Sequence, residues 1–119
     1  YNYGNHHRDF TYVDDVVGYI SLIIKKPSIR KIPYQIFNIG SDDPKSLKYF
    51  VKVIEKVLQI TSKQKLLPFQ KGDVLKTHAD ISKIRRATKL QPKFNIEKGI
   101  KKFVTWYINY YKVNKKSKK

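Results

Sequence analysis

Few residues of this 119-residue chain have the types and spacing that chemistry at a protein site requires. The chain has no cysteine, which excludes thiolate nucleophiles, disulfides and cysteine-based zinc sites. Its three histidines, His6, His7 and His78, lack the spacing of a metal site and are interpreted as solvated or packing residues. Gly40-Ser41 could cradle a phosphate, but one glycine after a strand is more typical of a plain turn. The five glycines are scattered, so no G-x-G-x-x-G dinucleotide-binding turn is present.

The charge of the chain is strongly unbalanced, with 26 basic and 9 acidic residues and a formal net charge of +17. Such a balance favours an anionic partner, such as nucleic acid, a membrane surface or a phosphate-bearing ligand. The competing interpretation, which we favour, is a solvated lysine-rich surface. The aromatic cluster of Trp106, Tyr107, Tyr110 and Tyr111 could stack bases, but at helical spacing such rings more often belong to core plus interface. Nucleic acid is therefore the less favoured partner.

The size and hydropathy of the chain indicate one globular domain with a modest core. Its longest apolar runs, such as residues 20–24, are too short to cross a bilayer, and no secretory signal is recognised. We therefore expect a cytoplasmic location and no membrane partner. The chain has no methionine, not even at position 1, and we expect it to be a fragment of a longer protein.

About four helices are expected from the apolar periodicity and its end signals. The first begins at Val13, carries an apolar stripe at i, i+3 and i+4 spacing, and is ended by Pro27. Ser46 is expected to cap a second helix, Asp80 a third and Asn95 a fourth.

Two or three short strands are expected between these helices. Tyr34–Ile39 is the stronger strand candidate and Lys63–Leu67 the weaker one. Short strands separated by helices predict a small α/β layer, which by itself is marginal and requires a neighbour to cover its open edge. We expect this domain to span residues 1–113, and we expect residues 114–119 to be a disordered basic tail.

Four sequence blocks resemble the extended short-chain dehydrogenases that act on nucleotide sugars. They are RDFTYVDD at residues 8–15, FNIGS at 37–41, QKGDV with Thr77 and Ala79-Asp80 at 70–80, and IEKGI followed by FVTWY at 96–107. Among the subfamilies, the chain is most similar to bacterial UDP-glucuronate 4-epimerases. The resemblance implies an α/β fold, that of the small C-terminal substrate-binding subdomain of an NAD-dependent nucleotide-sugar epimerase or dehydratase.

The resemblance implies a substrate-binding role for three residues. Arg8 would contact the diphosphate of a UDP-sugar through charge-assisted hydrogen bonds, although read alone it is a surface arginine paired with Asp9 or Asp14. Asp73 would accept hydrogen bonds from the ribose hydroxyls, although read alone its segment is a turn. Gln70 holds the position at which galactose-type epimerases carry a second phosphate-binding arginine.

The chain lacks the redox machinery that the family uses. Full-length relatives bind NAD through a glycine-rich turn and use a Tyr-x-x-x-Lys pair as the base. The literal match from Tyr111 to Lys115 lies where the last helix ends and is interpreted as coincidence. We therefore expect no catalytic residue, no metal and no cofactor in this chain alone, and NAD only in the full-length parent.

The expected function is a contribution of UDP-sugar binding to a UDP-glucuronate-type 4-epimerase that makes capsule or surface polysaccharide precursors. The fragment is expected to be inactive alone, and a separately encoded N-terminal NAD-binding portion is a candidate partner. Two alternatives stay open: a basic nucleic-acid-binding module, and the non-functional remnant of a split gene.

Overall fold

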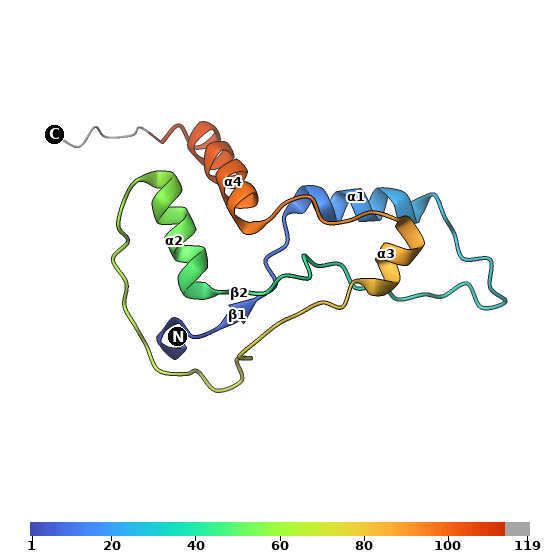
Figure 1. The fold of residues 1–119 in the computed structure, drawn as a ribbon, viewed down its shortest axis with the longest axis horizontal. Coiled ribbons are helices and arrows are strands. Elements are labelled where there is room, and N and C mark those ends of the chain that lie inside the picture. Colours follow the sequence, from blue (N-terminus) through green and yellow to red (C-terminus); the bar gives the residue numbers. More distant parts are fainter. Residues whose placement is uncertain (114–119) are drawn as a thin grey trace.

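The computed structural model describes residues 1–113 of the chain (Figure 1). Its elements in chain order are the 3-10 turn η1 (Asn2–Gly4), β1 (His7–Arg8), α1 (Val13–Ile24), β2 (Lys45–Ser46), α2 (Leu47–Leu58), α3 (Ser82–Thr88) and α4 (Ile96–Tyr110). The expected small α/β fold is thereby confirmed. The expected disordered tail and Lys115 of the Tyr-x-x-x-Lys match lie outside the described residues.

Local capping explains where three of the helices begin. The Ser46 hydroxyl accepts a hydrogen bond from the Tyr49 amide at 3.1 Å, which fixes the start of α2. The Asn95 side chain accepts from the Lys98 amide at 3.0 Å and does the same for α4. Both predicted caps are confirmed. The predicted cap of α3 is wrong by one residue, because Ile81 occupies the N-cap position and the Asp80 carboxylate accepts from the Ser82 amide at 2.8 Å.

The two predicted strands are not strands in the structure. Sheet hydrogen bonding is confined, among residues 1–113, to the antiparallel pair β1–β2, in register His7 to Ser46, and to a parallel bridge from His7 to Lys76. Residues 34–39 find no ladder partner in the described chain, and residues 63–67 make a single main-chain bond, from the Tyr3 amide to the Leu67 carbonyl. A strand requires a partner along its length, and apolar alternation alone does not supply one.

The apolar side chains form two separate cores and not one. Val53, Ile100 and Val104 are buried between α2 and α4, which lie side by side in Figure 1. Tyr19 and Ile84 are buried between α1 and α3 at the other end of the molecule. The chain is correspondingly flat and long, with extents of 65 × 36 × 19 Å and a radius of gyration of 18.0 Å. A compact domain of this length has a radius of gyration of about 13–14 Å.

The predicted apolar stripe of α1 is mostly exposed. Val13, Val17, Ile20 and Ile24 are 44–74% accessible, while the opposite side of the helix buries Tyr19 and Asp15. Monomeric proteins rarely leave contiguous apolar faces open to water. The exposed apolar face of α1 is therefore a surface that the neighbour expected over the open side of the α/β layer would cover. No helix among the described residues is long and apolar enough to cross a membrane.

The aromatic cluster of α4 lies outside both cores. Trp106 stacks on Tyr110 with ring centroids 5.4 Å apart, and Tyr107 lies 4.7 Å from Tyr111. All four rings are 45–67% exposed, and none of them is among the residues packed in the core between α2 and α4. The expectation that they contribute to the core is wrong, because Ile100 and Val104 fill the contact with α2.

Candidate functional site

The main chain around β1 brings the segments of Arg8 and Asp73 together. The His7 amide donates to the Leu75 carbonyl at 2.9 Å, and the Thr77 amide donates to the His7 carbonyl at 3.1 Å. These two bonds lay residues 73–77 alongside β1, although the segments are far apart in sequence. The site is therefore positioned by pairing between segments and not by one helix or turn.

Arg8 and Asp73 form a direct ion pair. Arg8 Nη2 donates to Asp73 Oδ1 at 2.8 Å across a sequence separation of 65 residues, and the side chains are 27% and 33% exposed. Arg8 Nη1 also donates to the main-chain carbonyls of His7 at 2.9 Å and Leu75 at 3.4 Å. Three hydrogen bonds thus orient the guanidinium, and the side chain remains partly accessible to solvent.

Asp73 belongs to a turn that begins at Gln70. The Asp73 amide donates to the Gln70 carbonyl at 3.2 Å, and Gly72 adopts a φ of +85°, a conformation that side chains rarely tolerate. The Val74 amide donates to Asp73 Oδ1 at 2.8 Å. Gln70 therefore helps to shape the site through its main chain, and its exposed side chain makes no hydrogen bond within the described part of the molecule.

His6 is a residue of this site that the sequence did not reveal. Its side chain is buried, with 3% of the residue exposed, and its Nε2 lies 3.1 Å from Asp73 Oδ2. The approach has the length of an ion pair but not the geometry of a hydrogen bond, so Nε2 has no hydrogen-bond partner within residues 1–113. Of the two roles expected for it, solvated or packing, its burial excludes the solvated one. The one available signal is its i, i+2 spacing to Arg8, which in an extended chain places two side chains on one face.

Asp9 does not pair with Arg8, because it holds three segments of the chain together. Its Oδ1 accepts from the Ser41 amide at 2.9 Å and from the Ser41 hydroxyl, and its Oδ2 accepts from the Ala79 amide at 3.0 Å. Burial raises the pKa of this carboxyl, but the hydrogen bonds outweigh burial and hold the pKa below its ordinary value. Asp14, the other expected partner of Arg8, pairs instead with Lys102 at 3.1 Å.

The Asp9 hydrogen bonds also explain the glycine at position 40. A Cβ atom there would lie 2.5 Å from the Ala79 Cβ and 2.6 Å from Asp9 Oδ2, so any residue with a side chain would force these neighbours to shift. The amide and hydroxyl of Ser41 are already bonded to Asp9, so Gly40-Ser41 is a close-approach turn and not a phosphate cradle.

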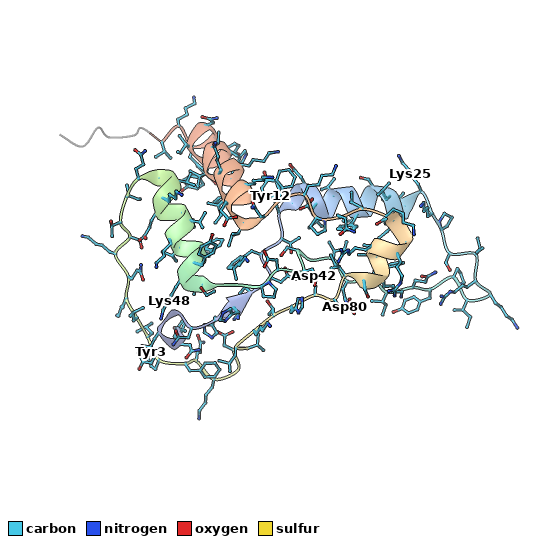
Figure 2. All side chains as sticks on the ribbon, viewed as in Figure 1. Tyr3, Tyr12, Lys25, Asp42, Lys48 and Asp80 are labelled. Carbon is cyan, nitrogen blue, oxygen red and sulfur yellow. The ribbon has the colours of Figure 1, made fainter. Side chains whose placement is uncertain are left out.

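The other two histidines lie outside the Arg8–Asp73 pair. His7 is exposed, and the ring of His78 contacts Asp42 Oδ1 at 2.8 Å; Arg85 reaches the other oxygen of Asp42 at 3.2 Å. Figure 2 shows Asp42 between β2 and the start of α3. No group of three or more metal-ligating side chains occurs among the residues that the structure describes.

Comparison with known proteins places the chain in a family. An uncharacterised protein of Methanocaldococcus jannaschii is 48% identical over 108 residues, which are 91% of this chain and 32% of that protein. The protein CapI of Staphylococcus aureus is 38% identical over 126 residues, 94% of this chain and 38% of CapI. UDP-glucuronate 4-epimerase 1 of Arabidopsis thaliana is 37% identical over 121 residues, 93% of this chain and 28% of that enzyme. No protein-family model matches the chain.

Solved structures share the fold. A UDP-glucose 4-epimerase from Thermotoga maritima, solved with UDP-glucose, superposes with a TM-score of 0.79 and 27% identity over 91% of this chain and 33% of that one. A UDP-glucuronic acid 4-epimerase from Bacillus cereus, in complex with UDP-glucuronic acid and NAD, gives a TM-score of 0.79 at 24% identity over 91% of this chain and 34% of that one. At that identity the second match supports the fold alone.

The fold and the sequence relatives together define a class, the NAD-dependent nucleotide-sugar epimerases and dehydratases of the extended short-chain dehydrogenase fold. Over about nine tenths of its length the chain is similar to UDP-glucuronate 4-epimerases of this class, and it corresponds to a C-terminal piece of them. It spans about a third of the length of the curated relatives that it matches.

Proposed function

We propose that this chain supplies the UDP-sugar-binding part of a UDP-glucuronate-type 4-epimerase and that it is inactive alone. The observation that carries the proposal is the contact between Arg8 and Asp73, 2.8 Å apart and both partly exposed. A cation for a diphosphate thus lies beside an anion for ribose hydroxyls, on two segments that only the fold brings together. From the resemblance to bacterial glucuronate-type epimerases, the proposal extends to a cytoplasmic role in making polysaccharide precursors.

The donor and acceptor inventory of the pair leaves room for a ligand. A guanidinium has five N–H donors, and Arg8 makes three contacts in this structure. Its remaining donors are available for phosphate oxygens in charge-assisted hydrogen bonds. Asp73 retains acceptor capacity on Oδ2 for the ribose hydroxyls. The exposed amide of Gln70 adds a neutral contact to the same diphosphate, where an arginine would add a second charge.

The described residues do not fit NAD. The two glycine turns that could offer main-chain amides to a pyrophosphate are both engaged: Ser41 donates to Asp9, and the Asp73 and Val74 amides donate within their own turn. We assign no step of the sugar oxidation and reduction to this chain. That chemistry falls to an NAD-binding portion, separately encoded or covalently continuous with this one.

The exposed stripe of α1 is the surface we assign to that NAD-binding portion. Val17, Ile20 and Ile24 present an apolar face to water, and the molecule is too elongated for a self-contained domain. The relatives are about three times as long as the region that matches this chain, so their remaining two thirds are long enough to contain an NAD-binding portion.

Titration calorimetry with UDP-glucuronate tests the proposed binding role. Arg8→Ala should weaken binding by roughly tenfold or more, since it removes charge-assisted hydrogen bonds to phosphate, and Asp73→Asn by about fivefold. The matched control is Arg30→Ala, at an arginine in the exposed segment after α1, which should leave the affinity unchanged. Equal affinity of the Arg8 variant and the wild type, or turnover of UDP-glucuronate by this chain alone with NAD, would refute the proposal.

A further inference from the structure

The buried imidazole of His6 occupies an unusual position in the site. Its residue is 3% exposed, its Nε2 makes no hydrogen bond within residues 1–113, and the nearest acceptor is Asp73 Oδ2 at 3.1 Å. Buried polar atoms without a partner are rare because the loss of water is not compensated. The atom is therefore aimed at the site carboxylate without bonding to it in this arrangement.

The two oxygens of Asp73 have different surroundings. Oδ1 accepts from Arg8 Nη2 and from the Val74 amide, both at 2.8 Å. Oδ2 faces His6 alone among the described polar contacts. One of the two groups that orient the carboxylate through Oδ1 is therefore Arg8, which the proposed function assigns to a diphosphate. A diphosphate bound to the remaining donors of Arg8 competes with Asp73 for the guanidinium and weakens the contact between Arg8 and Asp73.

We propose that His6 is a positioning residue for Asp73: its Nε2–H takes up Oδ2 when a nucleoside diphosphate draws Arg8 onto its phosphates. The carboxylate then stays turned toward the ribose hydroxyls and does not follow the guanidinium. The inference rests on the proposed function, since it concerns the same ligand. It requires the imidazole tautomer that carries its proton on Nε2.

The surroundings of His6 suit this role. Its carbonyl accepts from the Leu47 amide at 2.8 Å, and the next residue pairs in β1, so the main chain that carries the ring is fixed. The ring of Phe69 lies beside the imidazole, with centroids 6.0 Å apart. From this fixed base, a small rotation of either side chain converts the 3.1 Å approach into a hydrogen bond.

The inference predicts a specificity. His6 acts only through Asp73, and Asp73 acts on the ribose, so His6 should matter for a nucleoside diphosphate but not for a bare diphosphate. Arg8, in contrast, should matter for both. A role of His6 in packing alone would weaken both ligands together through loss of the fold.

Calorimetry on the whole 119-residue chain, with UDP and with inorganic pyrophosphate, tests the inference. His6→Phe keeps an aromatic ring but removes the nitrogen, and it should weaken UDP binding roughly tenfold, the loss of one hydrogen bond to a charged group, with pyrophosphate changed by less than about twofold. His6→Gln restores an N–H donor and should recover part of the loss. His7→Phe, the same change at the exposed neighbour, is the matched control and should bind both ligands as the wild type does.

A second measurement, by NMR, tests the interaction between His6 and Asp73 without any ligand. The ¹⁵N resonances of the His6 ring report which nitrogen carries the proton, and Asp73→Asn should shift them if Nε2 and Oδ2 interact. Unchanged ring resonances would overturn the inference, as would equal UDP affinity of His6→Phe and the wild type, or parallel losses of UDP and pyrophosphate. If the wild-type chain binds neither ligand, the proposed function fails, and the ring resonances decide whether the His6–Asp73 interaction exists.

Discussion

The helix pairs α2–α4 and α1–α3 differ in how far their apolar faces are buried. Between α2 and α4, Val53, Ile100 and Val104 are buried by the two helices themselves. Between α1 and α3, Tyr19 and Ile84 are buried, but the stripe that includes Val17 and Ile20 faces water. The two ends of one small molecule thus show that apolar periodicity marks a face for burial without stating what will bury it.

The largest expected difference between the pairs comes from truncating one isoleucine in each. Ile100→Ala should lower the free energy of unfolding by about 2–4 kcal/mol, because it leaves a cavity between α2 and α4. Ile20→Ala should cost less than about 1 kcal/mol, because that residue is already 44% exposed. Urea unfolding followed by circular dichroism measures both, and equal losses would mean that the stripe of α1 is covered within this chain.

The junction of the two pairs depends on Asp15. This buried carboxylate on α1 accepts from the amides of Lys93 and Phe94 at 3.0 and 3.1 Å, just before α4 begins. Asp15→Ala leaves two amides without partners and should cost about 1–3 kcal/mol. Asp14→Ala next to it breaks only an exposed pair with Lys102 and should cost at most about 1 kcal/mol. Similar unfolding midpoints for the two variants would contradict this assignment.

The smallest expected effect is a pH dependence from Asp9, whose hydrogen bonds adjoin the α1–α3 end. The pKa of Asp9 is lower in the folded chain than its ordinary value, so its contribution to stability is present above the unfolded pKa of about 3.9. It is lost as the pH falls through the folded pKa. Asp9→Asn should therefore be less stable than the wild type near pH 6, and the difference should shrink on acidification. Urea titrations at several pH values measure it; a difference that stays constant down to pH 2 would exclude this linkage.

The candidate site divides between what the sequence predicted and what it could not. Arg8 and Asp73 were predicted from motif blocks, but not their contact, since 65 residues separate them. His6 was missed because burial of a histidine depends on which distant segment packs over it. Gln70 keeps its predicted role only as a proposal, because no contact of its side chain is observed within the described chain.

The helices of this protein follow from the sequence alone, because caps such as Ser46 and Asn95 and the 3.6-residue periodicity act within one or two turns of chain. The sheet does not, because a strand exists only with its partner, and the pairing of His7 with Ser46 joins segments nearly forty residues apart. The same long-range pairing decides that Asp9 binds Ser41 and Ala79, and that His6 and Arg8 meet at Asp73. The sequence determines the short-range hydrogen bonds because their partners are neighbouring residues. Only the tertiary structure determines which distant side chains contact the same carboxylate.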